Sequence, residues 1–518
     1  MTTTRLMSKV RLVLSSPATF RWIVALFLVQ AFFSVVFISP STPKDGIGGQ
    51  YVQRNEDGVV PDGHRHLGAI YYYAEQPILQ GPTLPSMGED DLWMGDLVRF
   101  PSYLYYYALS FPVRLAMMLG ASDTAIIYLV RFIGVGFGVM ALLVFHRITR
   151  LVTSSVAIQN ISALAFALTG SFVWLSAAEN YDIMALLLWF LFVYASMNLF
   201  IKKDAKYLYW MALWFFTLGV TKYTYIPFAG LFGLVALILY VRNKKASTIK
   251  LFQHSISSDV SGWLRKLRAW QVVIGIVLLL GSVGLFAERI GGNLVIYHSF
   301  NPSCTKLYSQ QGCMNFGVYA RNYNQKARIE NGTATPIEYV PVVGYPAWWA
   351  KRYFDSMYVY MGHIYIPVYS YFIEAAGILA AIIGGIMLIL ARIKRIRLFK
   401  NQAEWYLLAV VLTLTAVQFM FNLNTVVNYA GQPYAHQGRY LLSVVGFAYV
   451  LYLIVLGRVL AEQSSKAQRA IMGVGLAVAV YAVVVVSALP SFLTHATSPV
   501  WYSQAAQSVL PDWVTNRN

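Results

Sequence analysis

Residues 270–287 read WQVVIGIVLLLGSVGLFA, a stretch without a single acidic or basic side chain. A helix of this length and polarity can cross the hydrocarbon core of a bilayer, which needs about 20 predominantly apolar residues. Similar runs recur along all 518 residues, of which 58% are hydrophobic and 12% charged. An average soluble protein carries about twice that share of charge. The composition excludes a water-soluble globular enzyme and predicts an all-α polytopic membrane protein.

We expect about 11 transmembrane helices in a single membrane domain, residues 1–518. The first, 21–39, follows several basic residues and has no small-residue cleavage site, so it is expected to be a retained helix rather than a removed signal peptide. The other expected spans are 122–145, 155–176, 183–201, 207–221, 225–241, 270–287, 367–391, 404–421, 440–459 and 470–489.

The charge pattern predicts how the chain is oriented. The net charge of +18 comes from 40 Lys and Arg against 22 Asp and Glu, but these lie mostly between apolar runs, so no nucleic-acid partner is expected. With the N-terminus inside, the inner connections hold 24 of the 40 basic residues, and 18 of the 22 acids fall outside. The positive-inside rule therefore favours a cytoplasmic (inner) membrane protein with its N-terminus inside and its C-terminus outside.

In this orientation the long connections are all extracytoplasmic. They are loop 40–121, loop 288–366 and the tail 490–518. Residues 64–76 and 101–119 have the Tyr-rich, amphipathic character of interfacial helices. Any chemistry is expected outside, with loop 40–121 as the catalytic loop.

Two acids stand at the outer starts of predicted helices. Asp62 follows a proline, and Asp182 ends the tight turn Ala178-Glu179-Asn180-Tyr181-Asp182. Each could simply cap a helix, because a carboxylate is favoured at a helix N-terminus. Acids at a membrane edge are also often functional. Loop 40–121 contains further acids that could form a solvated turn, namely Glu89, Asp90, Asp91 and Asp96.

Three cations, Arg131, Lys222 and Arg439, are predicted at outer helix ends, against the positive-inside trend. Snorkelling explains one such cation more easily than three. Convergent Arg and Lys side chains suit a phosphate, Arg through forked hydrogen bonds and Lys as a point charge. Pairing with Asp62 or Asp182 is a compatible alternative.

The cysteines and histidines of the sequence indicate whether a disulfide or a metal site is expected. The chain has two cysteines, Cys304 and Cys313, in one outer loop, and in an oxidising compartment they predict a disulfide. His64 and His66 could hold a divalent cation together with nearby acids. A two-residue spacing on a helix points them to different faces, so a metal is not favoured and no cofactor is expected.

These motifs together resemble the GT-C superfamily of integral-membrane glycosyltransferases, and most closely a bacterial branch whose first outer loop carries Pro-Asp-Glu and a His four residues after the Asp. Here Pro61, Asp62 and His66 match, and Gly63 replaces the Glu. The resemblance covers most of the chain in order. It continues through Arg131, Asn180, Asp182, Lys222, Tyr225, Pro227, the stretch 354–367, and Gln437-Gly438-Arg439-Tyr440, which is its most specific motif.

The resemblance implies transfer of a sugar from a polyprenyl-phosphate donor to an extracytoplasmic glycan, lipid or protein acceptor, commonly with inversion. Asp62 would then be the general base, with Asp182 as its rival or partner. Arg439, Lys222 and Arg131 would bind the donor phosphate. The expected acceptor-binding or supporting residues are His66, Asn180, Glu179 and Tyr440.

Two other classes of protein fit part of this pattern. A transporter or flippase of lipid-linked substrates should show internal repeats with broken helices near mid-bilayer and balanced loops on both faces, and the sequence shows neither. A polymerase or ligase of lipid-linked glycans would also use outer-loop arginines.

Overall fold

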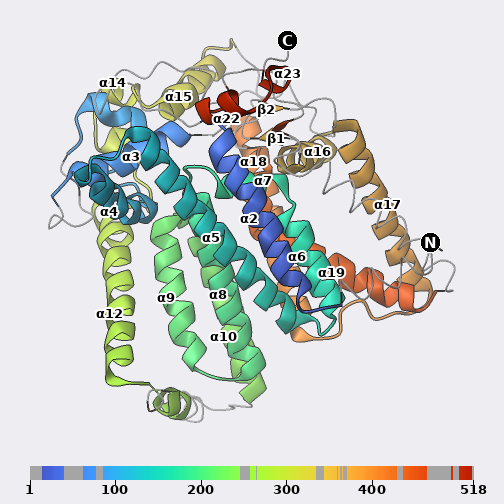
Figure 1. Ribbon diagram of the computed structural model, residues 1–518. Coiled ribbons are helices and arrows are strands. Elements are labelled where there is room, and N and C mark those ends of the chain that lie inside the picture. Colours follow the sequence, from blue (N-terminus) through green and yellow to red (C-terminus); the bar gives the residue numbers. More distant parts are fainter. Residues whose placement is uncertain are drawn as a thin grey trace.

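The computed structural model describes residues 15–39, 62–77, 84, 86–244, 257–263, 265, 267–333, 344–358, 360–361, 364–365, 370–428, 436–463, 492–493 and 501–515. The described part of the chain is almost entirely helical, with one two-residue antiparallel pair, β1 (Tyr360–Met361) and β2 (Ile364–Tyr365). Helices form an elongated bundle whose upper end in Figure 1 is covered by shorter helices. This is the architecture expected of a polytopic helical membrane protein.

Within the part of the chain that the structure describes, seven helical segments are long and apolar enough to cross a membrane. They contain the helices α2 (Thr19–Phe37), α5 (Asp123–Val152), α8 (Asp182–Lys202), η4 and α10 (Tyr223–Tyr225, Ile226–Lys244), α12 with η5 and α13 (Ala269–Phe286, Ala287–Gly291, Gly292–Tyr297), α18 (Gln402–Asn428), and η8 with α19 (Gly438–Leu441, Leu442–Ala461). Each occupies the position of an expected span.

The remaining expected spans differ from simple crossing helices. The segment 155–176 is two helices, α6 (Val156–Ala167) and α7 (Gly170–Ser176), which meet at 64°. At this break the Thr169 hydroxyl donates to the carbonyl of Ala165, a bond that bends helices. Gly170 also lies so close to Tyr358 that an added Cβ would be 3.4 Å from its carbonyl oxygen.

Two further expected spans are short, and one cannot be assessed. The helix α9 (Lys206–Thr221) has 16 residues, or about 24 Å, and the apolar part of α17 (Ser370–Ile393) covers Gly377–Ile393. The span 470–489 lies outside the described residues. The count of eleven crossings therefore stays a prediction.

The helix α8 lies at the centre of the bundle. Of its most apolar window 83% is buried, against 6% for the segment that contains α12. Aromatic and aliphatic side chains of α2, α5, α10, α18 and α19 pack around it in one continuous core. Asp182, the first residue of α8, is therefore held near the middle of the upper end of the bundle.

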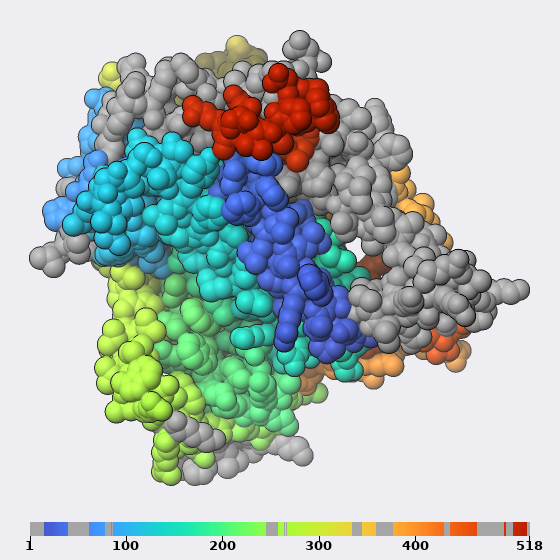
Figure 2. Space-filling view, viewed as in Figure 1, coloured from blue at the N-terminus to red at the C-terminus, as the bar shows by residue number. Residues whose placement is uncertain are grey.

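The covering layer is built from the two long loops and the C-terminal segment. It contains α3 (Gly63–Glu75), η3 (Glu89–Met94), α4 (Leu104–Met118), η6 (Cys304–Lys306), α14 (Gln310–Cys313), α15 (Gly317–Glu330), α16 (Tyr345–Tyr358), α22 (Gln504–Val509) and α23 (Asp512–Thr515). Segment 501–515 joins the upper end of α2 through the bridge between Ile38 and Tyr502 (Figure 2).

The two expected interfacial helices form, but their surroundings differ. Most residues of α3 are buried against α4 and η3, so α3 belongs to the interior of the covering layer. The helix α4 has the exposed apolar edge that suits a membrane interface, with Leu115 58% and Met118 77% exposed. Arg114 ties the two together by donating to the carbonyls of Ala74 (2.8 Å) and Gln76 (2.6 Å) at the end of α3.

Candidate functional site

Four charged side chains from four separate elements meet beneath the covering layer. Asp62 precedes α3, Asp182 begins α8, Lys222 follows α9, and Arg439 lies in η8. Lys222 Nζ is 2.7 Å from Asp182 Oδ1, Arg439 Nε is 3.7 Å from Asp182 Oδ2, and Arg439 Nη2 is 3.6 Å from Asp62 Oδ2. Two cations and two carboxylates thus form one charged cluster.

Neither carboxylate caps its helix. Asp62 adopts a left-handed backbone conformation (φ 59°, ψ 14°) and makes no side-chain cap hydrogen bond, a conformation that Asp tolerates better than most residues. The carboxylate of Asp182 bonds Lys222, while its backbone N–H donates to Asn180 Oδ1 at 2.8 Å. Both acids thus lie at helix starts without making a capping hydrogen bond, and Asn180 supports Asp182 by shaping the turn.

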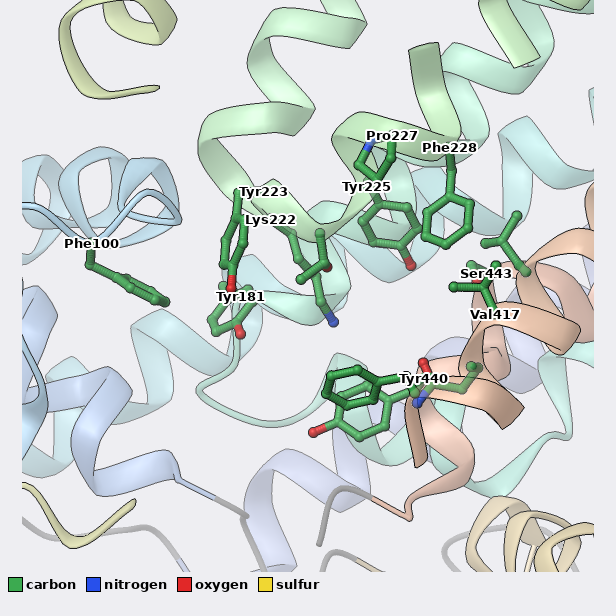
Figure 3. A pocket seen from close by; sticks show the side chains of 14 residues that line it. Phe100, Tyr181, Lys222, Tyr223, Tyr225, Pro227, Phe228, Val417, Tyr440 and Ser443 are labelled. Carbon is green, nitrogen blue, oxygen red and sulfur yellow. The ribbon is translucent and has the colours of Figure 1, made fainter. Parts of the chain in front are cut away.

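Aromatic rings surround the Lys222 amine. Its Nζ lies 5.1 Å from the ring centroid of Tyr440, 5.6 Å from that of Tyr181 and 5.8 Å from that of Tyr225. In Figure 3 the amine points into the space between Tyr225 and Tyr440. The π faces and Asp182 together stabilise a buried positive charge.

Arg439 is held in place by the glycine before it. The N–H of Gly438 donates to Ser356 Oγ at 2.6 Å, and a Cβ on Gly438 would lie 2.6 Å from the backbone nitrogen of Met357, so only glycine fits there. Nε and Nη1 of Arg439 are buried and make no hydrogen bond within the described residues. A buried guanidinium with unused donors is suited to an anionic ligand, since such donors are costly to leave unpaired.

His66 lies beside this cluster and is enclosed. Its Nδ1 is 2.7 Å from the Tyr106 hydroxyl, and its ring meets Tyr181 edge-on at 5.0 Å. Burial lowers the pKa of His66 to about 3, and the opposing effect of Asp62 does not reverse this. His66 is therefore a neutral supporting residue at physiological pH.

The two histidines diverge as their spacing predicts. His64 stacks on Trp93 with ring centroids 6.1 Å apart, on the other side of α3 from the contact between His66 and Tyr106. Among the described residues no group of three or more His, Cys, Asp or Glu side chains could hold a metal ion.

An apolar cavity of about 510 Å³ adjoins the charged cluster (Figure 3). Its walls come from the junction of α9 and α10, from α18 and from the start of α19; they include Phe100, Tyr181, Lys222, Tyr225, Phe228, Leu414, Val417, Gln418, Phe421 and Tyr440. Val417 and Phe421 are also 45% and 55% exposed. The cavity therefore reaches the apolar outer surface of the bundle and has Lys222 at its polar end.

Below the cavity, α10 and α18 are joined by two hydrogen bonds. Asn243 Nδ2 donates to Gln402 Oε1 at 2.7 Å, and the Tyr406 hydroxyl donates to the carbonyl of Phe232 at 3.3 Å. Higher up, side chains of the same two helices line the cavity, and Lys222 lies at this level.

Two of the expected site residues lie elsewhere. Arg131 and Glu179 are both fully buried and form an ion pair of 2.6 Å. Arg131 also donates to the backbone carbonyls of Val35, Ile38 and Ser39 at the end of α2. Arg131 does not line the cavity, so the structure brings Lys222 and Arg439 together without it.

The disulfide expected between Cys304 and Cys313 is present. It closes a segment of the covering layer that reaches Glu89, the acid at the start of η3. The other expected loop acids are partly structural, because Asp96 accepts the N–H groups of Val98 and Arg99.

Sequence reasoning missed two contacts of the site. Arg65 pairs with Asp62, with Nη1 3.2 Å from Oδ1, and its position three residues further along a helix was an available signal. Tyr106 holds His66 across a large sequence separation, and no local pattern pointed to it.

No family model matches this chain, and no curated protein is significantly similar to it. The chemistry of the site is therefore inferred from its geometry and from the family resemblance of its motifs.

Proposed function

We propose that this protein is an integral-membrane glycosyltransferase that moves a sugar from a polyprenyl-phosphate donor to an acceptor on the extracytoplasmic side. The observation that carries the proposal is that Lys222 lines a cavity reaching the apolar outer surface, while Asp182 links Lys222 to Arg439, whose buried Nε and Nη1 make no hydrogen bond among the described residues. A polyprenyl phosphate has this same division into an apolar chain and an anionic head. Lys222 and Arg439 would hold the phosphate, and the cavity between α10 and α18 would admit the chain.

The two carboxylates suit different roles. Asp182 is 7% exposed and is committed to Lys222 and Arg439, whereas the side chain of Asp62 is 38% exposed. A general base must reach the acceptor hydroxyl, so Asp62 is the better placed of the two. Asp182 would position the phosphate-binding cations.

The proposed reaction is a single displacement. Asp62 takes the proton of the acceptor hydroxyl while that oxygen bonds to the anomeric carbon. The bond between this carbon and the phosphate oxygen breaks, and polyprenyl phosphate leaves with the electron pair. Lys222 and Arg439 offset the charge that develops on it, and no metal ion is required by this scheme.

The proposal is tested with purified protein in liposomes, a panel of polyprenyl-phosphate pentoses and hexoses as donors, and an extract of cell-envelope glycans and lipids as the acceptor. Wild-type protein should release polyprenyl phosphate, and Asp62→Asn should reduce release by about 10²–10⁴-fold without changing donor binding or thermal stability. Asp90→Asn is the matched control, because Asp90 is an exposed acid of the same loop, and it should behave as wild type.

Other outcomes would assign the function differently. Activity of Asp62→Asn within a few-fold of wild type, together with an inactive Asp182→Asn, would exchange the two roles. Movement of the labelled lipid between leaflets without release of polyprenyl phosphate would contradict a transferase and favour a flippase.

A further inference from the structure

Residues 304–316, which contain the loop closed by the disulfide between Cys304 and Cys313, are locked onto the first outer loop. Ser309 Oγ donates to Glu89 Oε1 at 2.6 Å, and Asn315 Nδ2 donates to the Glu89 carbonyl at 3.0 Å. Gly312 lies directly against this side chain, since an added Cβ would be 2.5 Å from Glu89 Cδ. These contacts hold residues 304–316 in a defined position over η3.

The last residue of this segment, Phe316, reaches the helix that follows Asp62. The Arg65 guanidinium carbon lies 4.6 Å from the centroid of the Phe316 ring. Gly95 (φ 90°) completes the arrangement, because an added Cβ there would be 3.4 Å from the Phe316 ring and 3.5 Å from Arg65 Nη2. The Phe316 N–H donates to the carbonyl of Cys313 at 3.1 Å, so the ring is tied to one of the disulfide cysteines.

Arg65 connects Phe316 to the proposed base. Arg65 Nη1 bonds Asp62 Oδ1 at 3.2 Å, while Asp62 Oδ2 faces Arg439 at 3.6 Å. The carboxylate thus lies between two guanidinium groups, one from the covering layer and one from η8. An arginine side chain has many rotamers and loses considerable entropy when ordered, so a flat ring on one side of the guanidinium favours the geometry that meets Asp62.

We propose that Arg65 is a positioning residue for Asp62, and that segment 304–316, anchored by the disulfide between Cys304 and Cys313, keeps Arg65 in place through Phe316. This rests on the proposed function of Asp62 as the base. Breaking the disulfide would loosen Phe316 and Arg65 and reduce turnover, while leaving the phosphate-binding pair of Lys222 and Arg439 intact. The site would then be fully competent only in an oxidising compartment.

The kinetic experiment compares two replacements of Phe316. Phe316→Leu keeps an apolar side chain but removes the π face, and should lower kcat by about 3- to 10-fold with an unchanged KM for the donor. Phe316→Trp keeps a π face and should stay close to wild type. Arg65→Gln should lower kcat by about 10- to 100-fold, since small displacements of a reacting group cost that much.

Reduction provides a second perturbation. Dithiothreitol gives two electrons and two protons to the disulfide, which becomes two thiols while the reagent becomes a cyclic disulfide. Because the chain has only two cysteines, no other cysteine can respond. Wild-type turnover should fall on reduction, and the Cys304→Ser/Cys313→Ser variant should be as slow as reduced wild type and indifferent to dithiothreitol.

A readout without catalysis separates this proposal from the proposed function. Labelling of Asp62 by a water-soluble carbodiimide, followed by peptide mass spectrometry, should become faster in Phe316→Leu and in reduced wild type. Asp512, an exposed acid on the same end of the molecule, serves as the internal reference. If wild type transfers no sugar, the glycosyltransferase proposal fails, and the labelling rates still report whether Phe316 holds Asp62.

Unchanged kcat and unchanged Asp62 labelling in both Phe316→Leu and reduced wild type would overturn the proposal. Equal losses in Phe316→Leu and Phe316→Trp, with equally lowered melting temperatures, would show a purely structural role for Phe316 and overturn it as well.

Discussion

Asp62 and Asp182 have the same side chain but differ in burial and in how closely they pair with cations. Asp182 is buried and bonds Lys222 at 2.7 Å, whereas Asp62 is 38% exposed and lies 3.2 Å from Arg65. The carboxylate that we propose as the base is therefore the one that is less tightly paired and more accessible. The more deeply paired carboxylate instead keeps the cations in position.

The guanidinium of Arg439 supplies forked donors that lysine lacks. Arg439→Lys keeps the charge but loses these donors, so we expect donor binding to weaken by about 1.5–3 kcal/mol, the typical contribution of a hydrogen bond to a charged group. Arg439→Gln should weaken it further. Equilibrium binding of a fluorescent polyprenyl phosphate to protein in detergent measures both effects, and wild-type affinity in Arg439→Gln would contradict the assignment.

His66 makes folding sensitive to acid. Its pKa is about 3 in the folded protein and about 6.5 in an unfolded chain. As pH falls below about 6.5, the unfolded chain binds a proton that the folded protein does not, so stability decreases, by up to about 1.4 kcal/mol per pH unit. Above that pH the histidine contributes no pH dependence.

The variant His66→Gln removes this titration and keeps a polar partner for Tyr106. Between pH 7 and pH 5 its melting temperature should fall less than that of wild type, as measured by thermal unfolding in detergent. Parallel curves for the two proteins would contradict the expected role of His66.

A buried ion pair joins several elements behind the site. Arg131 of α5 contacts Glu179 in the turn before α8 and three carbonyl oxygens at the end of α2. This turn leads directly into Asp182, so the pair fixes the frame that presents Asp182 to Lys222. We therefore expect Arg131 to act on the site through backbone position rather than through contact with a ligand.

Removing one partner of this pair should destabilise the protein. Glu179→Gln or Arg131→Met leaves an uncompensated buried charge or unpaired carbonyls, a change that typically costs about 3–5 kcal/mol. The double variant Arg131→Met/Glu179→Leu should recover part of that loss. Unfolding in denaturant measures the stability, and donor affinity in the folded fraction should stay near that of wild type. A clear loss of donor affinity without a loss of stability would show that Arg131 does help to bind the donor phosphate.

The two ends of the molecule differ in the charged groups that they carry. The basic last turns of α5, α8, α10, α17 and α19 lie at the end opposite to α3, α4 and α16 (Figure 1). The charged cluster, the disulfide and the C-terminal segment share the other end. This separation is what the positive-inside rule requires if the site faces away from the cytoplasm.

Cysteine labelling tests this orientation. Because both native cysteines form a disulfide, an introduced cysteine is the single free thiol. In intact cells, cysteines replacing Lys203 or Lys394 should be shielded from an impermeant thiol reagent, and one replacing Asn331 should be labelled. Labelling of Lys203→Cys in sealed cells would invert the topology and remove the extracytoplasmic site.

The order of residues along the chain was sufficient to predict where most helices lie and at which helix ends the charged side chains of the site occur. Hydrophobic runs specify helices locally, because burial in lipid depends on the composition of about 20 consecutive residues. The segment 270–287 is therefore found as α12 and the start of η5, and the cysteines that pair lie only nine positions apart. The positions of Asp62, Asp182, Lys222 and Arg439 at outer helix ends follow from the same boundaries.

The contact partners of these residues could not be predicted from the order of residues along the chain. Whether Arg131 meets Glu179 or a phosphate, and whether Arg65 meets Phe316, depends on how helices and loops far apart in the chain pack together. The bend between α6 and α7 likewise arises where Gly170 approaches the backbone of Tyr358. Packing of this kind is a property of contacts between distant segments, and a charged side chain takes as its partner whichever group those contacts bring within reach.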